Sequence, residues 1–263
     1  MNILVCIKQV PDTTHVSIDP NTNTLIREGV ASIINPFDMY AIEEAIRLKE
    51  RFGGKTTVIT MGPPQADAAL REALSMGMDE AVHLQDRAFA GSDTWATSLV
   101  LARAIQKIGN FDLIICGKQA SDGDTAQVGP GIASHLGLPQ ATYVRKIDTI
   151  HLDTQPKVMV VERLVEEGFE IFELKLPCLI TVVKEINEPR LPSLKGKMRS
   201  RKQQVPLWGY KDLGLGEEQI GLKGSPTQVV KIFTPPSKEG GKIFKGEPSE
   251  IVKDLVSEIK DLI

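Results

Sequence analysis

The stretch that decides the fold is Phe111-Asp112-Leu113-Ile114-Ile115-Cys116, followed directly by Gly117-Lys118-Gln119-Ala120-Ser121-Asp122-Gly123-Asp124-Thr125-Ala126-Gln127-Val128-Gly129-Pro130. Its first part is the short apolar run of a buried strand, and its second part is a turn of small residues that leads into a helix. Ligands of an open α/β sheet bind at the carboxyl ends of parallel strands, where loop N–H groups and a helix N-terminus favour anions such as phosphate. The stretch therefore predicts a nucleotide-binding loop; the alternative is an ordinary strand-to-helix connection in which Gly and Asp only form the turn.

Upstream of this stretch, short apolar runs alternate with amphipathic segments. Strands are predicted at 3–8, 56–60, 81–84 and 111–116, and helices at 39–51, 65–76, 93–108 and 125–136. Asp38 is the expected N-cap of the first helix, and Ser92 or Asp93 that of the third. This alternation predicts an α/β fold, a doubly wound and mostly parallel sheet with helices on both faces.

Downstream of Pro139 the pattern changes to consecutive strands, predicted at 141–152, 157–165, 170–176 and 178–185. Glu166-Glu167-Gly168 is a tight turn between two of them. These features predict an antiparallel hairpin extension of the sheet and the return of the last strand into it. We expect residues 1–185 to form one nucleotide-binding domain.

The remaining residues predict an exposed arm and a tethered helix. Residues 187–202 combine prolines and glycine with many cations and few apolar side chains, so they lack what a core element needs. We therefore expect an exposed arm over 186–235 that meets an acidic partner, the alternative being a solvated linker. Residues 236–263 predict a linker and an amphipathic helix whose apolar stripe needs a partner surface, formed by Ile251, Leu255, Ile259 and Leu262.

Composition excludes several classes of protein. The formal net charge of −3 over 263 residues gives no basic field for nucleic acid. There is no run of about 18 apolar residues that would span a membrane, and the N-terminus lacks the features of a signal peptide, so a cytoplasmic location is expected. The 3 cysteines and 4 histidines are scattered and predict neither disulfide nor metal site. No nucleophile or paired carboxylates suggest a catalytic residue.

Two other glycine-containing segments deserve comparison with the first. Met61-Gly62-Pro63-Pro64 also ends a predicted strand, so its glycine would let a backbone approach a ligand closely; a proline-rich helix entry is the equal alternative. Gly53-Gly54-Lys55-Thr56 has only a superficial likeness to a phosphate-binding P-loop. It lacks the required first glycine and follows a helix instead of a strand, so it predicts a helix C-cap.

Placed in order, several segments resemble the β-subunit of electron-transfer flavoproteins, and the resemblance covers essentially the whole chain. The segments that carry it are Val5-Cys6-Ile7-Lys8-Gln9, Asn35-Pro36-Phe37-Asp38, Met61-Gly62-Pro63, Gly117-Lys118-Gln119-Ala120, Leu176-Pro177 and Asn187-Glu188-Pro189-Arg190. The resemblance implies an α/β subunit that pairs with a larger α-subunit holding an electron-transferring FAD. In conventional members the β-subunit binds AMP as a structural ligand.

The resemblance also implies which residues bind the nucleotide. An adenylate site would be formed by Cys6, Asn35, Pro36, Phe37, Asp38 and Met61, with Gly62 and Pro63 beside it, and by Gly117, Lys118, Gln119, Ala120, Ser121, Asp122, Gly123, Asp124, Thr125, Ala126, Gln127 and Val128. The exposed arm would be the family's recognition loop. In it, Leu194 would anchor an acyl-CoA dehydrogenase-type partner, with Arg190, Lys195 and Lys197 meeting an acidic rim.

Met61-Gly62-Pro63-Pro64-Gln65 and residues 86–97 are similar to the electron-bifurcating branch of this family. That branch implies FAD in place of AMP, with hydride taken from NADH and electrons passed to ferredoxin and to the α-subunit flavin. The flavin ring would lie near Met61 and residues 86–97, where Arg87, Thr94 and Thr97 are candidate contacts. Two alternatives stay open: a conventional β-subunit with AMP, and a stand-alone ATP-binding or hydrolysing protein of similar topology.

Overall fold

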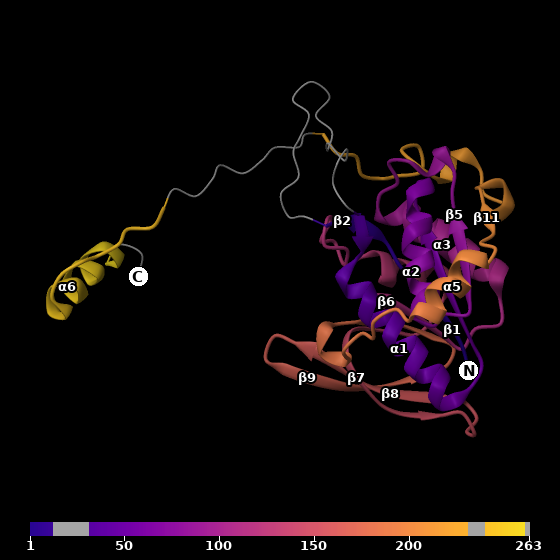
Figure 1. Ribbon diagram of the computed structural model, residues 1–263, viewed down its shortest axis with the longest axis horizontal. Helices are drawn as coiled ribbons and strands as arrows, with labels where there is room; N and C mark the ends of the chain where they lie inside the picture. The colour runs from indigo at the N-terminus through magenta and orange to yellow at the C-terminus, as the bar shows by residue number, and fades with distance from the viewer. Residues whose placement is uncertain (13–31, 231–239, 261–263) are drawn as a thin grey trace. The chain divides into compact units, whose positions relative to one another are not determined.

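A large sheet organises the protein (Figure 1). The computed structural model describes residues 1–12, 32–230 and 240–260. The sheet's strands are β1 (Asn2–Cys6), β4 (Lys55–Met61), β5 (Glu80–Leu84), β6 (Leu113–Gly117), β7 (Gln140–His151), β8 (Val158–Val165), β9 (Gly168–Lys175), β10 (Cys178–Val182) and β11 (Leu207–Trp208). Their order across the sheet is β11-β5-β4-β1-β6-β10-β7-β8-β9. The predicted doubly wound α/β fold is confirmed.

The strand order creates a crevice. All neighbours from β11 to β7 are parallel, whereas β7, β8 and β9 are antiparallel. The chain builds outward from β1 through β4 to β5, then returns to the other side of β1 as β6. The reversal lies between β1 and β6, where Cys6 and Cys116 are in register. In such sheets the carboxyl ends at this reversal are where ligands bind.

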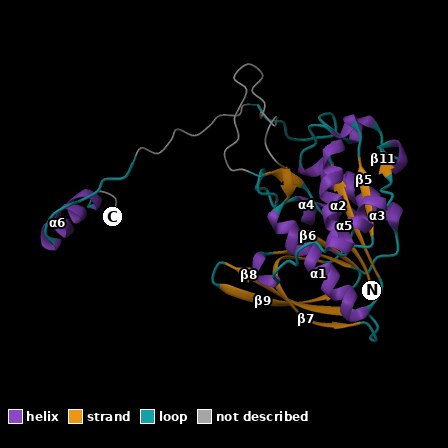
Figure 2. Cartoon of the chain, viewed as in Figure 1, coloured by secondary structure: helices purple, strands orange, loops and turns teal. Residues whose placement is uncertain are grey.

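Helices cover both faces of the parallel strands (Figure 2). Helices α1 (Pro36–Phe52) and α2 (Asp67–Met76) pack on one face, with Ile42 and Leu70 fully buried. Helices α3 (Thr94–Ile108) and α4 (Val128–Leu136) pack on the other, with Val100 and Ile132 fully buried. Strands covered on both faces are apolar throughout, which is why β6 and β10 read as continuous hydrophobic runs.

Helix starts differ from the predictions in two places. Helix α1 begins after Asn35 with Pro36 in its first turn, so Asp38 lies within the helix and is not its N-cap. Helix α4 begins at Val128, later than predicted, because Asp124 and Ala126 have φ of 52° and 54°, values that a right-handed helix excludes. Asp93 caps α3 as expected, accepting from the N–H of Ala96 at 3.0 Å.

The hairpin and the return strand are confirmed. Glu166 and Glu167 connect β8 to β9, and β10 then enters the sheet between β6 and β7. A small antiparallel pair, β2 (Gln9–Pro11) and β3 (Ser32–Ile34), was not predicted. Strands of this length carry too little alternation to be recognised in a sequence.

The cationic segment after residue 186 is more ordered than its composition predicts. Residues Leu194–Lys202 form helix α5, which packs on α2, while most of its side chains stay exposed. The surrounding chain makes short helical turns, η3 (Lys184–Ile186), η4 (Lys211–Leu213) and η5 (Glu217–Gln219), and the edge strand β11. Side-chain contacts to α2, described below, replace the apolar burial that the sequence lacks.

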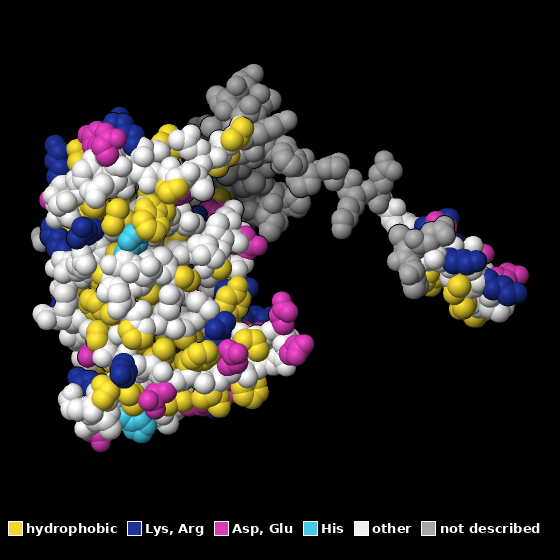
Figure 3. Space-filling view, turned by 180° about the vertical axis from the view of Figure 1, so that it is seen from behind, with side chains coloured by type: hydrophobic (Ala, Val, Ile, Leu, Met, Phe, Trp, Pro, Cys, Tyr) yellow, Lys and Arg dark blue, Asp and Glu magenta, His cyan; other side chains and the backbone are white. Residues whose placement is uncertain are grey.

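Residues 240–260 belong to a second unit and contain helix α6 (Pro248–Ile259). Val252, Leu255 and Val256 are exposed on it, and Figure 3 shows hydrophobic side chains along one side of this helix and Lys or Arg along the other. The amphipathic prediction holds here; Leu262 and residues 231–239 lie outside the described residues. Within the described residues no helix is long and apolar enough to cross a membrane.

Candidate functional site

The loops that the sequence singles out meet at one edge of the sheet, the carboxyl edge. Because β5, β4, β1 and β6 are parallel neighbours in this order across the sheet, the loops that follow them lie side by side in the same order. The Thr60 hydroxyl donates to the Ile7 carbonyl at 2.8 Å, and the Gln9 amide donates to the Gln65 carbonyl at 3.0 Å. The structure therefore brings residues 35–38, 61–63 and 117–128 to one edge, with Arg87, Thr94 and Thr97 following β5.

Asn35 holds the long loop after β6. Its side chain is buried, with Nδ2 donating to the Gln119 carbonyl at 2.8 Å and Oδ1 accepting from the Ser121 N–H at 3.0 Å. An amide can satisfy a backbone carbonyl and a backbone N–H at the same time, which a carboxylate cannot. Asn35 thus positions the loop of residues 117–128 by bonding to the backbone of that loop.

Asp38 ties the ends of β1 and β6 to the start of α1. Its carboxylate accepts from the Lys8 N–H at 2.7 Å and from the Gly117 N–H. Burial raises the pKa of Asp38 to about 7, against the lowering effect of these donors. A Cβ at Gly117 would lie 2.3 Å from Asp38 Oδ1 and 2.7 Å from the Phe37 carbonyl carbon, so glycine is required for this approach.

The two acidic side chains of the loop, Asp122 and Asp124, each have a partner within the protein. The Lys8 ammonium lies 2.6 Å from Asp122 Oδ1, and the Gln119 amide donates to the Asp124 carboxylate. In both contacts the carboxylate interacts with a donor of the protein itself. The loop can then face an anion with its backbone, although two aspartates occur in it.

The backbone of the same loop offers the donors that a phosphate needs. Ala126 is left-handed with φ 54°, and Gln127 follows in the right-handed region with φ −101° and ψ −18°. Successive residues of opposite hand turn their N–H groups towards one concavity. The N–H groups of residues 125–128 donate to no acceptor in the described part of the chain, and they lie at the N-terminus of α4. This donor set fits the phosphates of a nucleotide.

Lys118 lies between two aromatic rings beside this loop. Its Nζ is 5.6 Å from the Phe37 ring centroid and 5.0 Å from that of Tyr143. Tyr143 was not predicted, and it has φ 60° at an irregularity in the pairing of β7 with β10. Strained non-glycine residues concentrate at functional sites. No sequence signal marks Tyr143, because a tyrosine in a strand is ordinary.

Cys6 and Cys116 lie at the ends of β1 and β6, beneath the loops. Both are buried. A hydrogen bond with Cys6, together with burial, raises the pKa of the Cys116 thiol. Protonated buried thiols behave as small apolar side chains. Among the described residues, no three His, Cys, Asp or Glu side chains gather as metal ligands would.

The loops after β4 and β5 extend the carboxyl edge. The Gly62 N–H donates to the Leu84 carbonyl at 3.1 Å, and the unpredicted His83 lies with Nε2 3.1 Å from the Gly62 carbonyl oxygen. Pro63 then leads into the short turn η1 (Pro64–Ala66). These contacts set the backbone of residues 61–63 at the point where the loop leaves the sheet.

Arg87, Thr94 and Thr97 lie farther along the same edge. Arg87 is in the short turn η2 (Arg87–Phe89), exposed and without an acceptor in the described ranges. Thr94 begins α3, and the Thr97 N–H donates to the Asp93 carbonyl. A second helix N-terminus and one exposed guanidinium therefore accompany the loop of residues 117–128.

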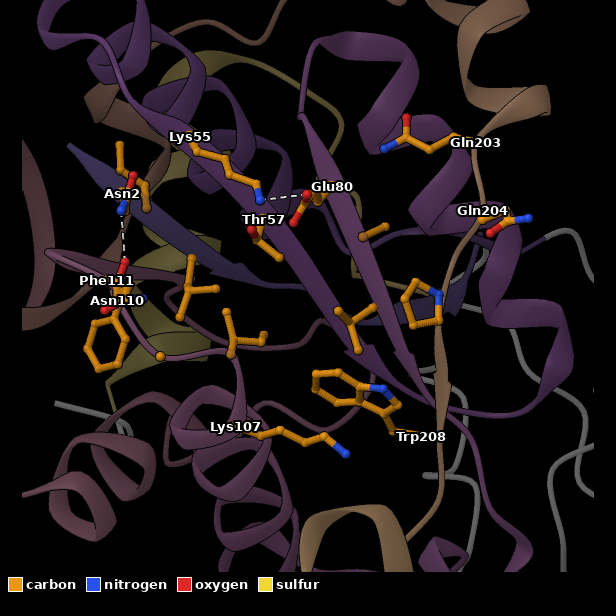
Figure 4. A pocket seen from close by; sticks show the side chains of 17 residues that line it. Asn2, Lys55, Thr57, Glu80, Lys107, Asn110, Phe111, Gln203, Gln204 and Trp208 are labelled. Carbon is orange, nitrogen blue, oxygen red and sulfur yellow. Dashed lines mark hydrogen bonds and ion pairs between the residues drawn. The ribbon is translucent and has the colours of Figure 1, made fainter.

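A cavity of about 680 Å³ lies at the opposite, amino edge of the sheet (Figure 4). Its cations are occupied: Lys55 pairs with Glu80 at 2.5 Å, and Lys107 lies over the Trp208 ring and donates to the Asp212 carbonyl. Both lysines that line the cavity are thus engaged within the protein. Ligands of such sheets bind at the other end of the strands, and we place the candidate site there.

The four residues expected to contact a protein partner differ in their interactions within the protein. Leu194, Lys195 and Lys197 are exposed on α5. Arg190 instead donates to Glu43 at 2.8 Å and to Glu50 at 2.6 Å, both on α1. Burial opposes ionisation of Glu43, yet the guanidiniums of Arg190 and Arg47 keep its pKa below the ordinary value.

Comparison with known proteins gives a consistent result. A family model described as the electron transfer flavoprotein domain matches residues 22–213. The chain is 55% identical over 260 residues to an electron transfer flavoprotein subunit beta of Thermoanaerobacterium thermosaccharolyticum, covering 98% of each chain.

Two further relatives have more specific names. The caffeyl-CoA reductase-Etf complex subunit CarD of Acetobacterium woodii is 51% identical, with 99% of this chain and 98% of the relative covered. Protein FixA of Azotobacter vinelandii is 48% identical, with 95% and 90% covered. The similarity extends over nearly the full length of each.

Proposed function

This chain belongs to the electron transfer flavoprotein family, as a β-subunit type with a role in electron transfer, and we propose that it binds FAD at the carboxyl edge of its sheet. In this proposal the protein is the electron-bifurcating kind of β-subunit. It oxidises NADH and delivers electrons to ferredoxin and, through an α-subunit FAD, to an acyl-CoA dehydrogenase-type enzyme. The alternative is a conventional β-subunit with structural AMP.

The N–H groups of residues 125–128, which donate to no acceptor within residues 1–12, 32–230 and 240–260, carry the proposal. They would bind the phosphates shared by FAD and AMP, with hydroxyls of Ser121 and Thr125 as further donors. Asn35 and Asp38 would hold the loop in place through the contacts to Ser121, Gln119 and Gly117. This arrangement supports a nucleotide at this edge for either alternative.

The loop after β5 supports FAD over AMP, because the residues expected to bind an adenylate follow β1, β4 and β6 and AMP has no flavin end to extend beyond them. Residues 61–63, Thr94 and Thr97 would line the flavin end, and Arg87 would place a positive charge there. Bound FAD supplies the hydride and electron chemistry, and the protein orients its rings and tunes them by hydrogen bonds and charge. Residues 91–95 include the small side chains of Ser92 and Thr94 and the exposed Gly91 at the start of α3, and this segment would leave room for NADH.

Two apolar surfaces support pairing with an α-subunit. On β9, Phe169, Ile171 and Phe172 are exposed, at 54%, 64% and 37%. On α6, Val252, Leu255 and Val256 are also exposed, and none of the described residues 240–260 buries them. Exposed apolar side chains grouped in this way mark interaction surfaces. The names of the relatives, one a subunit of a caffeyl-CoA reductase-Etf complex, support a partner that acts on CoA esters.

The decisive experiment is extraction of nucleotides from the purified αβ complex, with FAD and AMP weighed by mass spectrometry. The proposal expects two FAD per αβ pair and no AMP, together with NADH-driven reduction of ferredoxin that needs the dehydrogenase partner. One FAD with one AMP would establish the conventional alternative. ATP hydrolysis by this chain alone would contradict both the bifurcating and the conventional β-subunit.

A matched pair of variants tests the loop itself. Ala126→Asp and Ala126→Asn have the same shape, and both side chains tolerate the left-handed backbone that Ala126 adopts. Only the aspartate places a negative charge beside the N–H groups of residues 125–128. We expect the Asp variant to keep less than about a tenth of the wild-type nucleotide and the Asn variant to keep most of it, since each tenfold loss needs only about 1.4 kcal/mol. Equal retention would refute phosphate binding at this loop.

A further inference from the structure

Helices α2 and α5 each have an arginine that contacts the C-terminal end of the other helix. Arg199 of α5 donates from one nitrogen to the carbonyls of Leu74 and Met78, at 3.0 and 2.9 Å. Arg71 of α2 donates to the carbonyls of Ser200 and Gln203, at 2.6 and 2.5 Å. The last carbonyls of a helix lack their usual helical donors, and each guanidinium supplies donors to such carbonyls of the other helix; the Ser200 carbonyl also accepts from the Gln203 N–H at 3.3 Å. We call this pair of contacts the arginine clamp.

The two helices also approach closely. A Cβ at Gly196 would lie 2.0 Å from the Ser75 carbonyl oxygen, so only glycine permits the crossing. The Ser193 hydroxyl accepts from the Gly196 N–H at 2.9 Å and caps the start of α5. Upstream, the bidentate contacts of Arg190 to Glu43 and Glu50 attach the entry of the segment to α1. The helix is therefore held at its entry, middle and end.

The side chains left facing solvent form a distinct surface. Leu191, Leu194 and Met198 are 89%, 78% and 59% exposed. Leu194 and Met198 are one helical turn apart and share a face. Lys195, Lys197, Arg201 and Lys202 surround them and make no ion pair in the described part of the chain. Of the cations in this segment, Arg190 and Arg199 are thus used internally and these four remain for a partner.

We infer that the arginine clamp is a positioning device that presents Leu194 and Met198 as a preformed apolar ridge to a protein with an apolar pocket bordered by carboxylates. The inference rests on the proposed function for the identity of that partner class. A ridge held before the encounter costs less conformational entropy on docking than a loop that must order. The free cations then steer the encounter, and Met198 is a second anchor beside Leu194.

The test compares Arg199→Ala with Arg201→Ala in the αβ complex. Both variants remove one positive charge from α5, but only the first breaks the clamp. Amide hydrogen exchange is measured over residues 197–202, and electron delivery is measured against increasing concentrations of a purified acyl-CoA dehydrogenase. Reduction of a small dye acceptor and flavin content serve as readouts that the clamp does not touch. Arg199→Lys, whose ammonium can still donate to both carbonyls, tests rescue.

We expect Arg199→Ala to speed exchange over residues 197–202 about tenfold, since charge-assisted hydrogen bonds are lost. Its apparent KM for the dehydrogenase should rise about tenfold with kcat and dye reduction unchanged. Arg201→Ala should leave the exchange rate unchanged. Arg199→Lys should return both the exchange rate and the apparent KM most of the way to their wild-type values. Unchanged exchange in Arg199→Ala, or faster exchange without a change in KM, would overturn the inference. A wild-type complex that reduces no dehydrogenase would instead overturn the proposed partner class, while the exchange data still decide the clamp.

Discussion

At the scale of single residues, Asp38 shows how one buried carboxyl organises the site. It lies 5% exposed at the reversal of strand order and accepts from backbone N–H groups at the ends of β1 and β6. Because Asp38 is buried, it would influence the proposed nucleotide only through the backbone of Gly117 and Lys8. The neighbouring Asn35 acts in the same manner through Gln119 and Ser121.

Asp38 should give the protein a characteristic pH dependence. Its pKa is about 7 in the folded protein and 3.8 as the ordinary value, so between these values the native state holds a proton that the unfolded chain has released. The free energy of unfolding is therefore highest below pH 4 and falls as the pH rises through 7, by about 4 kcal/mol.

Urea unfolding of wild type and Asp38→Asn at pH 5, 6, 7 and 8 checks this expectation. The asparagine cannot titrate, so the wild-type free energy of unfolding should fall with rising pH relative to that of the variant. Parallel curves for the two proteins would show that Asp38 does not change protonation in this range.

At the scale of elements, the start of α3 joins the sheet domain to a distant part of the chain. Asp93 caps the helix through the Ala96 N–H and also accepts from the Thr227 N–H and hydroxyl, at 2.9 and 2.8 Å. Burial opposes its ionisation, but these donors keep the pKa of Asp93 below its ordinary value. One carboxylate therefore orders both the helix N-terminus at the proposed flavin end and the segment around residue 227.

Replacing this cap should destabilise the protein measurably. Asp93→Ala removes every one of these acceptors, and loss of an N-cap alone costs about 1–2 kcal/mol. Thr227→Val removes only the hydroxyl donor and keeps the helix cap, so its cost should be less than about half as large. The midpoints of urea unfolding at neutral pH are measured for wild type, Asp93→Ala and Thr227→Val. Equal decreases in the two variants would show that the helix cap does not contribute to stability.

At the scale of the whole molecule, the protein has an α/β unit and a separate unit with α6. Val252, Leu255 and Val256 of α6 are 59%, 44% and 54% exposed, and no residue of the helix is buried. An amphipathic helix gains most of its stability by burying its apolar face. We therefore expect the α-subunit to cover it.

Leu255→Glu should weaken the αβ complex at least about tenfold, because burying one uncompensated charge costs more than the 1.4 kcal/mol that tenfold represents. Ser257→Glu adds the same charge on the polar side of α6 and serves as the control. Titration of labelled α-subunit measures both dissociation constants. Similar affinities for the two variants would place the interface elsewhere, and the unfolding midpoint of the isolated chain should not change in either.

The sequence by itself determined the α/β class, the hairpin at Glu166 and Glu167, and the loop of residues 117–128, because these follow from local periodicity and turn chemistry. Only the tertiary structure decided that Asp38 bridges two strands instead of capping α1, that Tyr143 and His83 border the site, and that α5 is a helix. The physical reason is the same in each case. These features depend on partners distant in the chain, such as Gly117 for Asp38 and the carbonyls of Leu74 and Met78 for Arg199, and no local pattern records such contacts.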